Sequence, residues 1–143
     1  MKSKAFRQYK ETSVLTASPL RLILLCYDGA ITAIKTAQQA QAERKFELRD
    51  KEINRASALV GELLTALRDE GDQITANLKS LYLYILKMLL EASVKNDVEL
   101  YHAPLKVLDE LREAWQSLAE GRAVNFNGVK PEIMEQNAGG AAL

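Results

Sequence analysis

Residues 73–95 read QITANLKSLYLYILKMLLEASVK, and this stretch decides the fold class. Its apolar residues recur three and four positions apart, which is the spacing of one face of an α-helix. No sustained alternation of apolar and polar residues indicates a strand. The stretch is therefore predicted to form one long helix, whose core face consists of Ile74, Leu78, Leu81, Ile85, Met88, Leu89 and Ala92.

Two further helices are predicted before this stretch. The first begins at Ser18-Pro19, because serine is a favoured N-cap and proline fits the first helical position. Its core face carries Leu20, Ile23, Leu24, Tyr27, Ile31 and Ile34. The second runs from about Leu48 to Arg68, and Gly71 is suited to a left-handed position beyond its C-terminal end. Its stripe consists of Ile53, Ala56, Leu59, Val60, Leu63, Leu64 and Leu67.

A fourth helix is predicted after the connection Asn96-Asp97, with Asp97 as its N-cap and its end near Gly121. Its apolar residues are Leu100, Leu105, Leu108, Leu111, Trp115 and Leu118. Pro104 conflicts with a continuous helix, since an interior proline costs about 3 kcal/mol. Either the helix kinks there, or residues 98–102 form a separate turn and the main helix begins near Pro104. The kink is favoured, because the apolar residues on both sides of Pro104 fit one stripe.

Four helices with short connections predict an all-α fold, an antiparallel up-down four-helix bundle, over residues 18–121. Residues 1–17 are predicted to form a short N-terminal segment. Residues 122–143 are predicted to form a flexible tail.

Composition narrows the function. The chain has 143 residues, with 19 basic and 19 acidic side chains, so its formal net charge is zero. Nucleic-acid binding needs clustered positive charge, and no such partner is expected. No signal peptide is recognised, and the run Leu22–Tyr27 is too short to span a bilayer. Cys26 is the only cysteine, which suits a reducing compartment. The sequence thus predicts a cytoplasmic protein that is not inserted in a membrane.

The chemistry of an enzyme is missing from the sequence. His102 is the only histidine, which excludes di-iron sites built from Glu-x-x-His pairs and zinc sites built from Cys and His. No haem motif or glycine-rich phosphate loop is present. Cys26 is interpreted as a small core residue. We therefore expect no catalytic residues, no metal site, no cofactor and no enzymatic activity.

Three features in the predicted helices call for an explanation. Gly29 follows Asp28 in mid-helix, where glycine costs about 1 kcal/mol relative to alanine. Either another helix or a bound chain approaches Gly29 closely, or Asp28 bonds to a polar group on a neighbouring helix. Tyr82 and Tyr84 flank a core stripe, which suits either the edge of a groove or the rim of the bundle. Trp115 is interpreted as an anchor in the core or in a groove.

The chain resembles the FliS family of flagellar secretion chaperones over roughly residues 5–120. Two segments in the first half carry the resemblance, Thr16-Ala17-Ser18-Pro19 and Leu24-Leu25-Cys26-Tyr27-Asp28-Gly29-Ala30-Ile31. Further along, the similar segments are Asn77-Leu78-Lys79-Ser80-Leu81-Tyr82-Leu83-Tyr84, Leu90-Glu91-Ala92, Asn96-Asp97 and Leu111-Arg112-Glu113-Ala114-Trp115. The resemblance implies a helical bundle without enzymatic activity or cofactor. It also implies binding of the disordered C-terminal region of flagellin, prevention of its premature polymerisation, and delivery to FlhA at the flagellar type III export gate.

Grooves between the helices would receive amphipathic helical pieces of such a client. The residues predicted to line them are Leu20, Ile23, Leu24, Tyr27, Leu81, Tyr82 and Ile85. Phe6 and Tyr9 in the N-terminal segment are predicted to form a lid over a groove, and the resemblance also suggests that Tyr9 takes part in docking to the gate. Asp28, Gly29 and Trp115 are assigned to helix packing. A homodimer is compatible with the sequence.

Two alternatives remain open from the residues. One is a phosphotransfer bundle, in which His102 carries the phosphoryl group and Lys106 lies near it. The other is an adaptor bundle for a different helical client.

Overall fold

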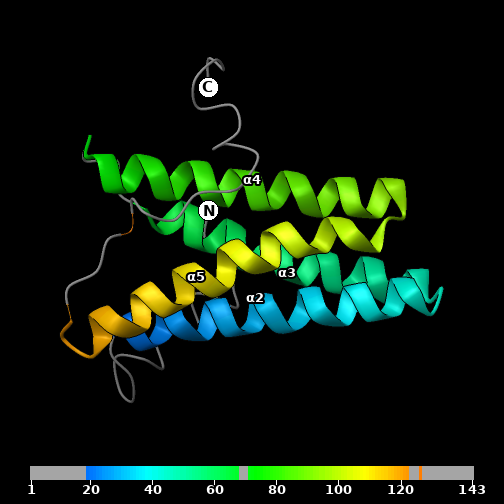
Figure 1. Ribbon diagram of the computed structural model, residues 1–143, viewed down its shortest axis with the longest axis horizontal. Coiled ribbons are helices and arrows are strands. Elements are labelled where there is room, and N and C mark those ends of the chain that lie inside the picture. The colour runs from blue at the N-terminus through cyan, green and yellow to red at the C-terminus, as the bar shows by residue number, and fades with distance from the viewer. Residues whose placement is uncertain (1–18, 68–70, 123–125, 127–143) are drawn as a thin grey trace.

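A computed structural model describes residues 19–67, 71–122 and 126 (Figure 1). Its elements in chain order are α2 (Pro19–Ala42), α3 (Phe46–Ala66), α4 (Gln73–Lys95), the 3₁₀-helix η1 (Val98–Tyr101) and α5 (His102–Ala119). The described ranges contain helices, turns and bends but no strand. The predicted all-α fold is confirmed.

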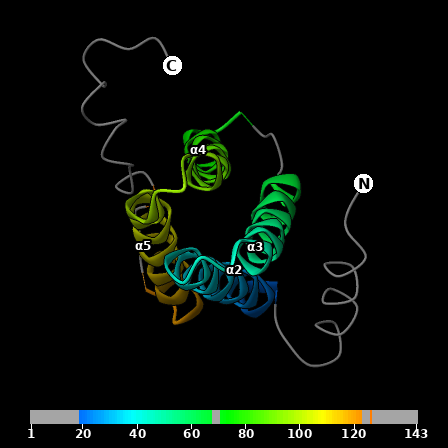
Figure 2. The same ribbon diagram turned by 90° about the vertical axis from the view of Figure 1, so that its right-hand side faces the viewer.

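The four α-helices run antiparallel to their neighbours in the chain along one long axis (Figure 1). Viewed nearly end-on, they surround a common interior in the order α2, α3, α4, α5 (Figure 2). Each helix packs against the next one around this ring, and α5 closes it by packing against α2. This is the predicted up-down four-helix bundle.

The core is built from the inward stripes of all four helices. Large residues such as Ile34, Leu81 and Leu111 are fully buried, and α2 adds several buried alanines. At Gly29 an added Cβ would lie 2.9 Å from Cδ1 of Leu59 on α3. The predicted close approach at Gly29 is therefore confirmed, and the approaching element is α3.

Asp28, the neighbour of Gly29, connects α2 to α5. Its carboxylate accepts hydrogen bonds from the Arg112 guanidinium, which forms a salt bridge with it at the surface. Both side chains are partly exposed, so the pair contributes little to stability but holds the two helices in one alignment. The predicted bond from Asp28 to a neighbouring helix is confirmed.

Pro104 does not kink a helix, so the favoured prediction was wrong. Asp97 caps η1 by accepting a hydrogen bond from the Glu99 N–H at 3.0 Å, and α5 begins only at His102. Pro104 is the third residue of α5. The first four N–H groups of a helix have no intrahelical partner, so proline removes no hydrogen bond there. The alternative of a separate turn over residues 98–102 is the one observed.

The connections around α4 follow their local chemistry. Asp72 caps α4 by accepting a hydrogen bond from the Thr75 N–H at 2.6 Å. Gly71 has φ +74°, the predicted left-handed conformation, but α3 already ends at Ala66, so Gly71 does not directly follow that helix. The predicted cap Ser18 lies outside the described residues.

A buried polar cluster ties together the end of the bundle where α2 meets α3 and α4 meets η1. Tyr101 Oη donates to Gln41 Oε1 at 2.8 Å, and Arg49 Nη1 also donates to Gln41 Oε1, at 3.3 Å. The same Arg49 nitrogen donates to Asn96 Oδ1 at 2.6 Å. These bonds hold the connections in one arrangement, although Gln41 Nε2 is left buried without a hydrogen-bond partner and Asn96 is exposed to water.

Candidate functional site

A buried aromatic network lies under the surface near the start of α2. The hydroxyl groups of Tyr27 and Tyr82 are hydrogen-bonded at 2.6 Å, and Trp115 Nε1 donates to Tyr27 Oη at 3.1 Å. Burial raises the pKa of Tyr82 to about 12 and also raises the pKa of Tyr27, so both phenols stay protonated at neutral pH. The network joins α2, α4 and α5 and gives this end of the bundle a rigid interior.

Four of the predicted groove residues belong to this interior rather than to an open surface. Tyr27, Leu81, Tyr82 and Ile85 are each at most 1% exposed. Their placement in an accessible groove was wrong, because the hydroxyls of both tyrosines find partners across the core. The prediction for Trp115 as a packing residue is confirmed, since its ring packs against that core.

The remaining predicted groove residues lie at the start of α2. Leu20, Ile23 and Leu24 are partly exposed, and the adjacent Leu25 is 41% exposed. Four apolar side chains with access to solvent within residues 20–25 are more than a solvated helix end requires. Their role in binding stays a prediction.

A second apolar surface, which the sequence analysis missed, lies on the outward face of α4. Leu83, Leu90 and Val94 are 48%, 64% and 72% exposed. They are spaced seven and four residues apart, so they share one helical face opposite the buried stripe. This second periodicity was a readable signal in the sequence. It was overlooked because the core stripe of the same helix already accounted for its hydrophobicity.

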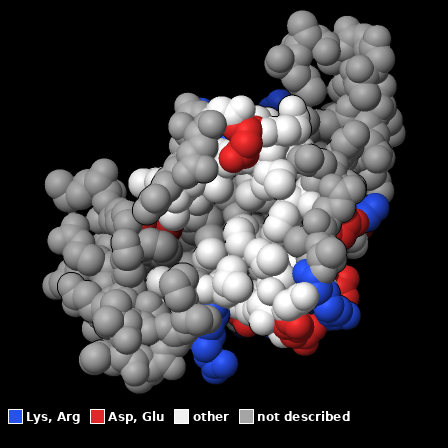
Figure 3. Space-filling view, turned by 90° about the vertical axis from the view of Figure 1, so that its left-hand side faces the viewer, with Lys and Arg blue, Asp and Glu red and all other residues white. Residues whose placement is uncertain are grey.

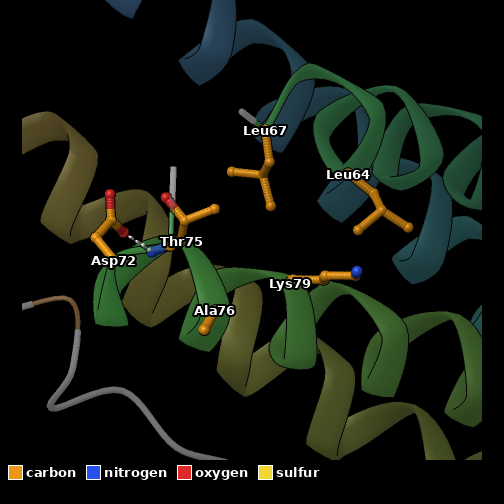
Figure 4. A pocket seen from close by; sticks show the side chains of 7 residues that line it. Leu64, Leu67, Asp72, Thr75, Ala76 and Lys79 are labelled. Carbon is orange, nitrogen blue, oxygen red and sulfur yellow. Dashed lines mark hydrogen bonds between the residues drawn. The ribbon is translucent and has the colours of Figure 1, made fainter. Parts of the chain in front are cut away.

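A pocket with a volume of about 370 Å³ opens between the end of α3 and the start of α4 (Figure 4). Leu64 of α3 and Leu67, the residue directly after that helix, reach into it, and the Lys79 side chain extends from α4 toward Leu64 (Figure 4). The capping bond from Thr75 to Asp72 lies at its edge and lowers the pKa of the Asp72 carboxyl. Leucine walls suit an apolar side chain, and the pocket lining carries one charge of each sign, the Lys79 ammonium group and the Asp72 carboxylate.

The end of the molecule at which α2 and α4 begin is largely uncharged. Uncharged residues cover the middle of this face, while the visible Lys, Arg, Asp and Glu side chains lie mostly toward its margins (Figure 3). An uncharged surface with charged side chains at its margin is compatible with a protein-binding site.

The residues considered for chemistry show no catalytic arrangement. Burial raises the pKa of the Cys26 thiol to about 11, with a further contribution from Glu62, so the thiol is a poor nucleophile. His102 is exposed in the first turn of α5, with Nε2 3.3 Å from Glu99 Oε2. In the described part of the chain, no group of three or more His, Cys, Asp or Glu side chains could hold a metal ion. Phe6 and Tyr9 lie outside the described residues.

The comparison with known protein families is decisive. The family model described as "Flagellar protein FliS" matches residues 2–122. The chain belongs to the FliS family. This match contains all four α-helices and both accessible apolar surfaces, whereas Phe126 lies beyond it.

Individual FliS proteins align over most of their length. The flagellar secretion chaperone FliS of Salmonella typhimurium is 29% identical over 119 residues, which cover 81% of this chain and 88% of that protein. The flagellar secretion chaperone FliSB of Pseudomonas aeruginosa is 31% identical over 121 residues, covering 81% and 96%. The FliS of Bacillus subtilis is 25% identical over 123 residues, covering 86% and 92%. These relatives are named as chaperones, and no helix among the residues described for this chain is long and apolar enough to cross a membrane.

Proposed function

We propose that this chain is a cytoplasmic export chaperone that binds the C-terminal region of flagellin and keeps it from polymerising before export. Membership of the FliS family supports this proposal most directly. The observation on the molecule that carries it is the apolar surface left uncovered by a bundle whose core is already filled. Leu90 and Val94 expose most of their side chains, and Leu25 and Leu83 nearly half.

The binding mode follows from the shape of these surfaces. An amphipathic client helix would place residues at i, i+3, i+4 and i+7 on the exposed stripe of α4, while another client segment covers Leu20, Ile23 and Leu24. The pocket between α3 and α4 would take one apolar side chain. Ordering a disordered client costs conformational entropy, so the complex gains only moderate affinity from a large contact area. Moderate affinity suits a client that must be released.

Isothermal titration calorimetry with a peptide of the flagellin C-terminal region tests the proposal. Wild-type chain should bind it, and the surface variants Leu24→Asp and Leu90→Glu should each weaken binding at least about tenfold, which corresponds to about 1.4 kcal/mol. Tyr82→Glu would not serve as a test, because a charge at this buried position would unfold the core.

Ala58→Glu is the matched control, since Ala58 is exposed on the outward side of α3, away from the apolar face of α4. It should bind like wild type. Urea unfolding of every variant verifies that the bundle is intact. Wild-type affinity in both folded surface variants would refute the assigned surfaces, and a wild-type chain that ignores the peptide would refute the function.

Delivery of the client to FlhA is part of the same proposal, with Phe6 and Tyr9 in the segment that docks on the gate or covers a groove. Deleting residues 1–15 should raise the affinity for the flagellin peptide and weaken capture of FlhA by the chaperone–flagellin complex. Unchanged values for both would argue against any role for this segment. Sedimentation of the free chain and of the complex decides whether a homodimer forms.

The two alternatives from the sequence receive no support from the family match. A phosphotransfer role of His102 would require that phosphohistidine be detected after incubation of the chain with a phosphodonor kinase. Competition by the flagellin peptide against any other helical client separates the adaptor reading from the proposed function.

A further inference from the structure

Phe126 is the described residue that lies beyond the FliS match, and it is part of the core. Its side chain is only 6% exposed, although the sequence analysis assigned it to a flexible tail. Its ring packs on Trp115 of α5, with the two ring centroids 4.8 Å apart and the planes tilted by 53°. Its main-chain carbonyl accepts a hydrogen bond from Asn77 Nδ2 of α4 at 2.9 Å. At this residue the prediction of a flexible tail was wrong.

Two groups hold Phe126: the Trp115 ring, which a hydrogen bond to Tyr27 keeps in place, and the Asn77 amide, which recognises only a main-chain carbonyl. Trp115 is held by its hydrogen bond to Tyr27, which is in turn bonded to Tyr82. Asn77 bonds to a main-chain carbonyl, a group that every residue carries. An aromatic platform beside a side-chain amide donor can bind an aromatic or large apolar side chain from any segment that places a main-chain carbonyl at Asn77.

We infer that the groove between α4 and α5 at Trp115 and Asn77 is a binding site for a large apolar residue of the client, and that Phe126 occupies this site in the free chain. The inference rests on the proposed function. A short connection to α5 gives Phe126 a high effective concentration at the site, so a single side chain competes with a much larger client. Binding of the client then requires that Phe126 leave, and departure of the client lets it return.

The size of the effect follows from occupancy. If Phe126 fills the site 70–90% of the time, the apparent affinity for the client falls by a factor of about 3 to 10. Phe126→Ala should therefore bind the flagellin C-terminal peptide about 3- to 10-fold more tightly than wild type. Phe126→Tyr, which keeps the ring, should bind like wild type.

Trp115 is the only tryptophan in the chain and reports on the site without any client. In Phe126→Ala its emission should shift to longer wavelength, because the indole loses its cover. Addition of the peptide to wild type should change the emission as Phe126 is exchanged for a client residue. Val129→Ala, another apolar residue beyond the FliS match, should change neither the emission nor the affinity.

The outcomes are distinct. A shifted Trp115 emission with unchanged or weaker client affinity in Phe126→Ala would overturn the inference alone and leave Phe126 as a packing residue. An unshifted emission would show that the contact is not populated and would also overturn it. Failure of both wild type and Phe126→Ala to bind the peptide would remove the proposed function, and the inference with it.

Discussion

Two glycines in helix interiors, Gly29 and Gly61, differ in whether a neighbouring helix packs against them. Gly29 on α2 lies where an added Cβ would contact the tip of Leu59 at 2.9 Å, whereas an added Cβ at Gly61 on α3 would meet no atom within 4 Å. Both glycines reduce helix propensity by about 1 kcal/mol relative to alanine. Only the first one allows a close approach of two helices.

This contrast makes a prediction for stability. Gly61→Ala should raise the free energy of unfolding by about 0.5–1 kcal/mol, because helix propensity improves without a contact. Gly29→Ala should gain less, since Leu59 must move away from the new methyl group. Urea unfolding measures both. In a Leu59→Ala background, Gly29→Ala should recover the full gain, and equal gains at the two positions in the wild-type background would contradict the packing argument.

At the scale of elements, the starts and ends of the helices depend on individual polar side chains. The α4 helix begins where Asp72 accepts the Thr75 N–H, and α5 begins where Pro104 can join a first turn without losing a hydrogen bond. The end of α4 is set by Asn96, which adopts a left-handed conformation with φ 51°. Asparagine tolerates that conformation better than most residues.

The cap of α4 has a pH dependence. The hydrogen bonds from Thr75 lower the pKa of Asp72 in the folded chain below its value in the unfolded chain, which is about 3.9. Its contribution to stability is therefore complete above about pH 5 and is lost as the pH falls through the folded pKa. Asp72→Ala should lower the unfolding temperature at pH 7, and the difference from wild type should shrink below about pH 4.

Asp72→Asn is the control for this cap, because asparagine caps a helix without a titratable group. Its unfolding temperature relative to Asp72→Ala should change little with pH. A wild-type advantage over Asp72→Ala that persists unchanged at pH 2.5 would contradict the role of the carboxylate. Calorimetric scans across this range measure all three proteins.

Arg49 joins separate elements through the buried polar cluster. It bonds to Gln41 at the end of α2 and to Asn96 after α4, while its guanidinium lies 4.9 Å from the Phe46 ring centroid. Arg49→Met keeps the length of the side chain but leaves Asn96 without this donor. It should lower the free energy of unfolding by about 2 kcal/mol, because charged hydrogen bonds in buried sites are lost.

Arg55→Met on the same helix is the control for Arg49, since Arg55 is exposed and its distance to Glu52 is 3.9 Å. Its effect should stay within about 0.5 kcal/mol. Chemical denaturation measures the free energy of unfolding of both variants. The comparison is valid if this free energy falls with denaturant concentration at the same slope in both. Equal losses in the two variants would show that the cluster contributes nothing specific.

On the scale of the whole molecule, the reactivity of the Cys26 thiol measures how often the core opens to solvent. The thiol is 1% exposed and burial raises its pKa to about 11, so it reacts only when the core opens. With a disulfide reagent at pH 8, native chain should react at least about 100-fold more slowly than chain in guanidinium chloride. Reaction at the unfolded rate would show a bundle that is open in solution.

The sequence by itself determined the all-α class, the number of long helices and the bounds of α4. These features depend on periodicity, capping and backbone freedom, which are properties of neighbouring residues. It could not decide which apolar residues become buried, because helical periodicity places a side chain relative to its own helix axis only. The pairing of Tyr27 with Tyr82, the packing of Phe126 on Trp115 and the exposure of Leu90 depend on which helices lie next to each other. Only the tertiary structure brings these distant segments together, since the free energy of burial depends on all the neighbours that a side chain acquires.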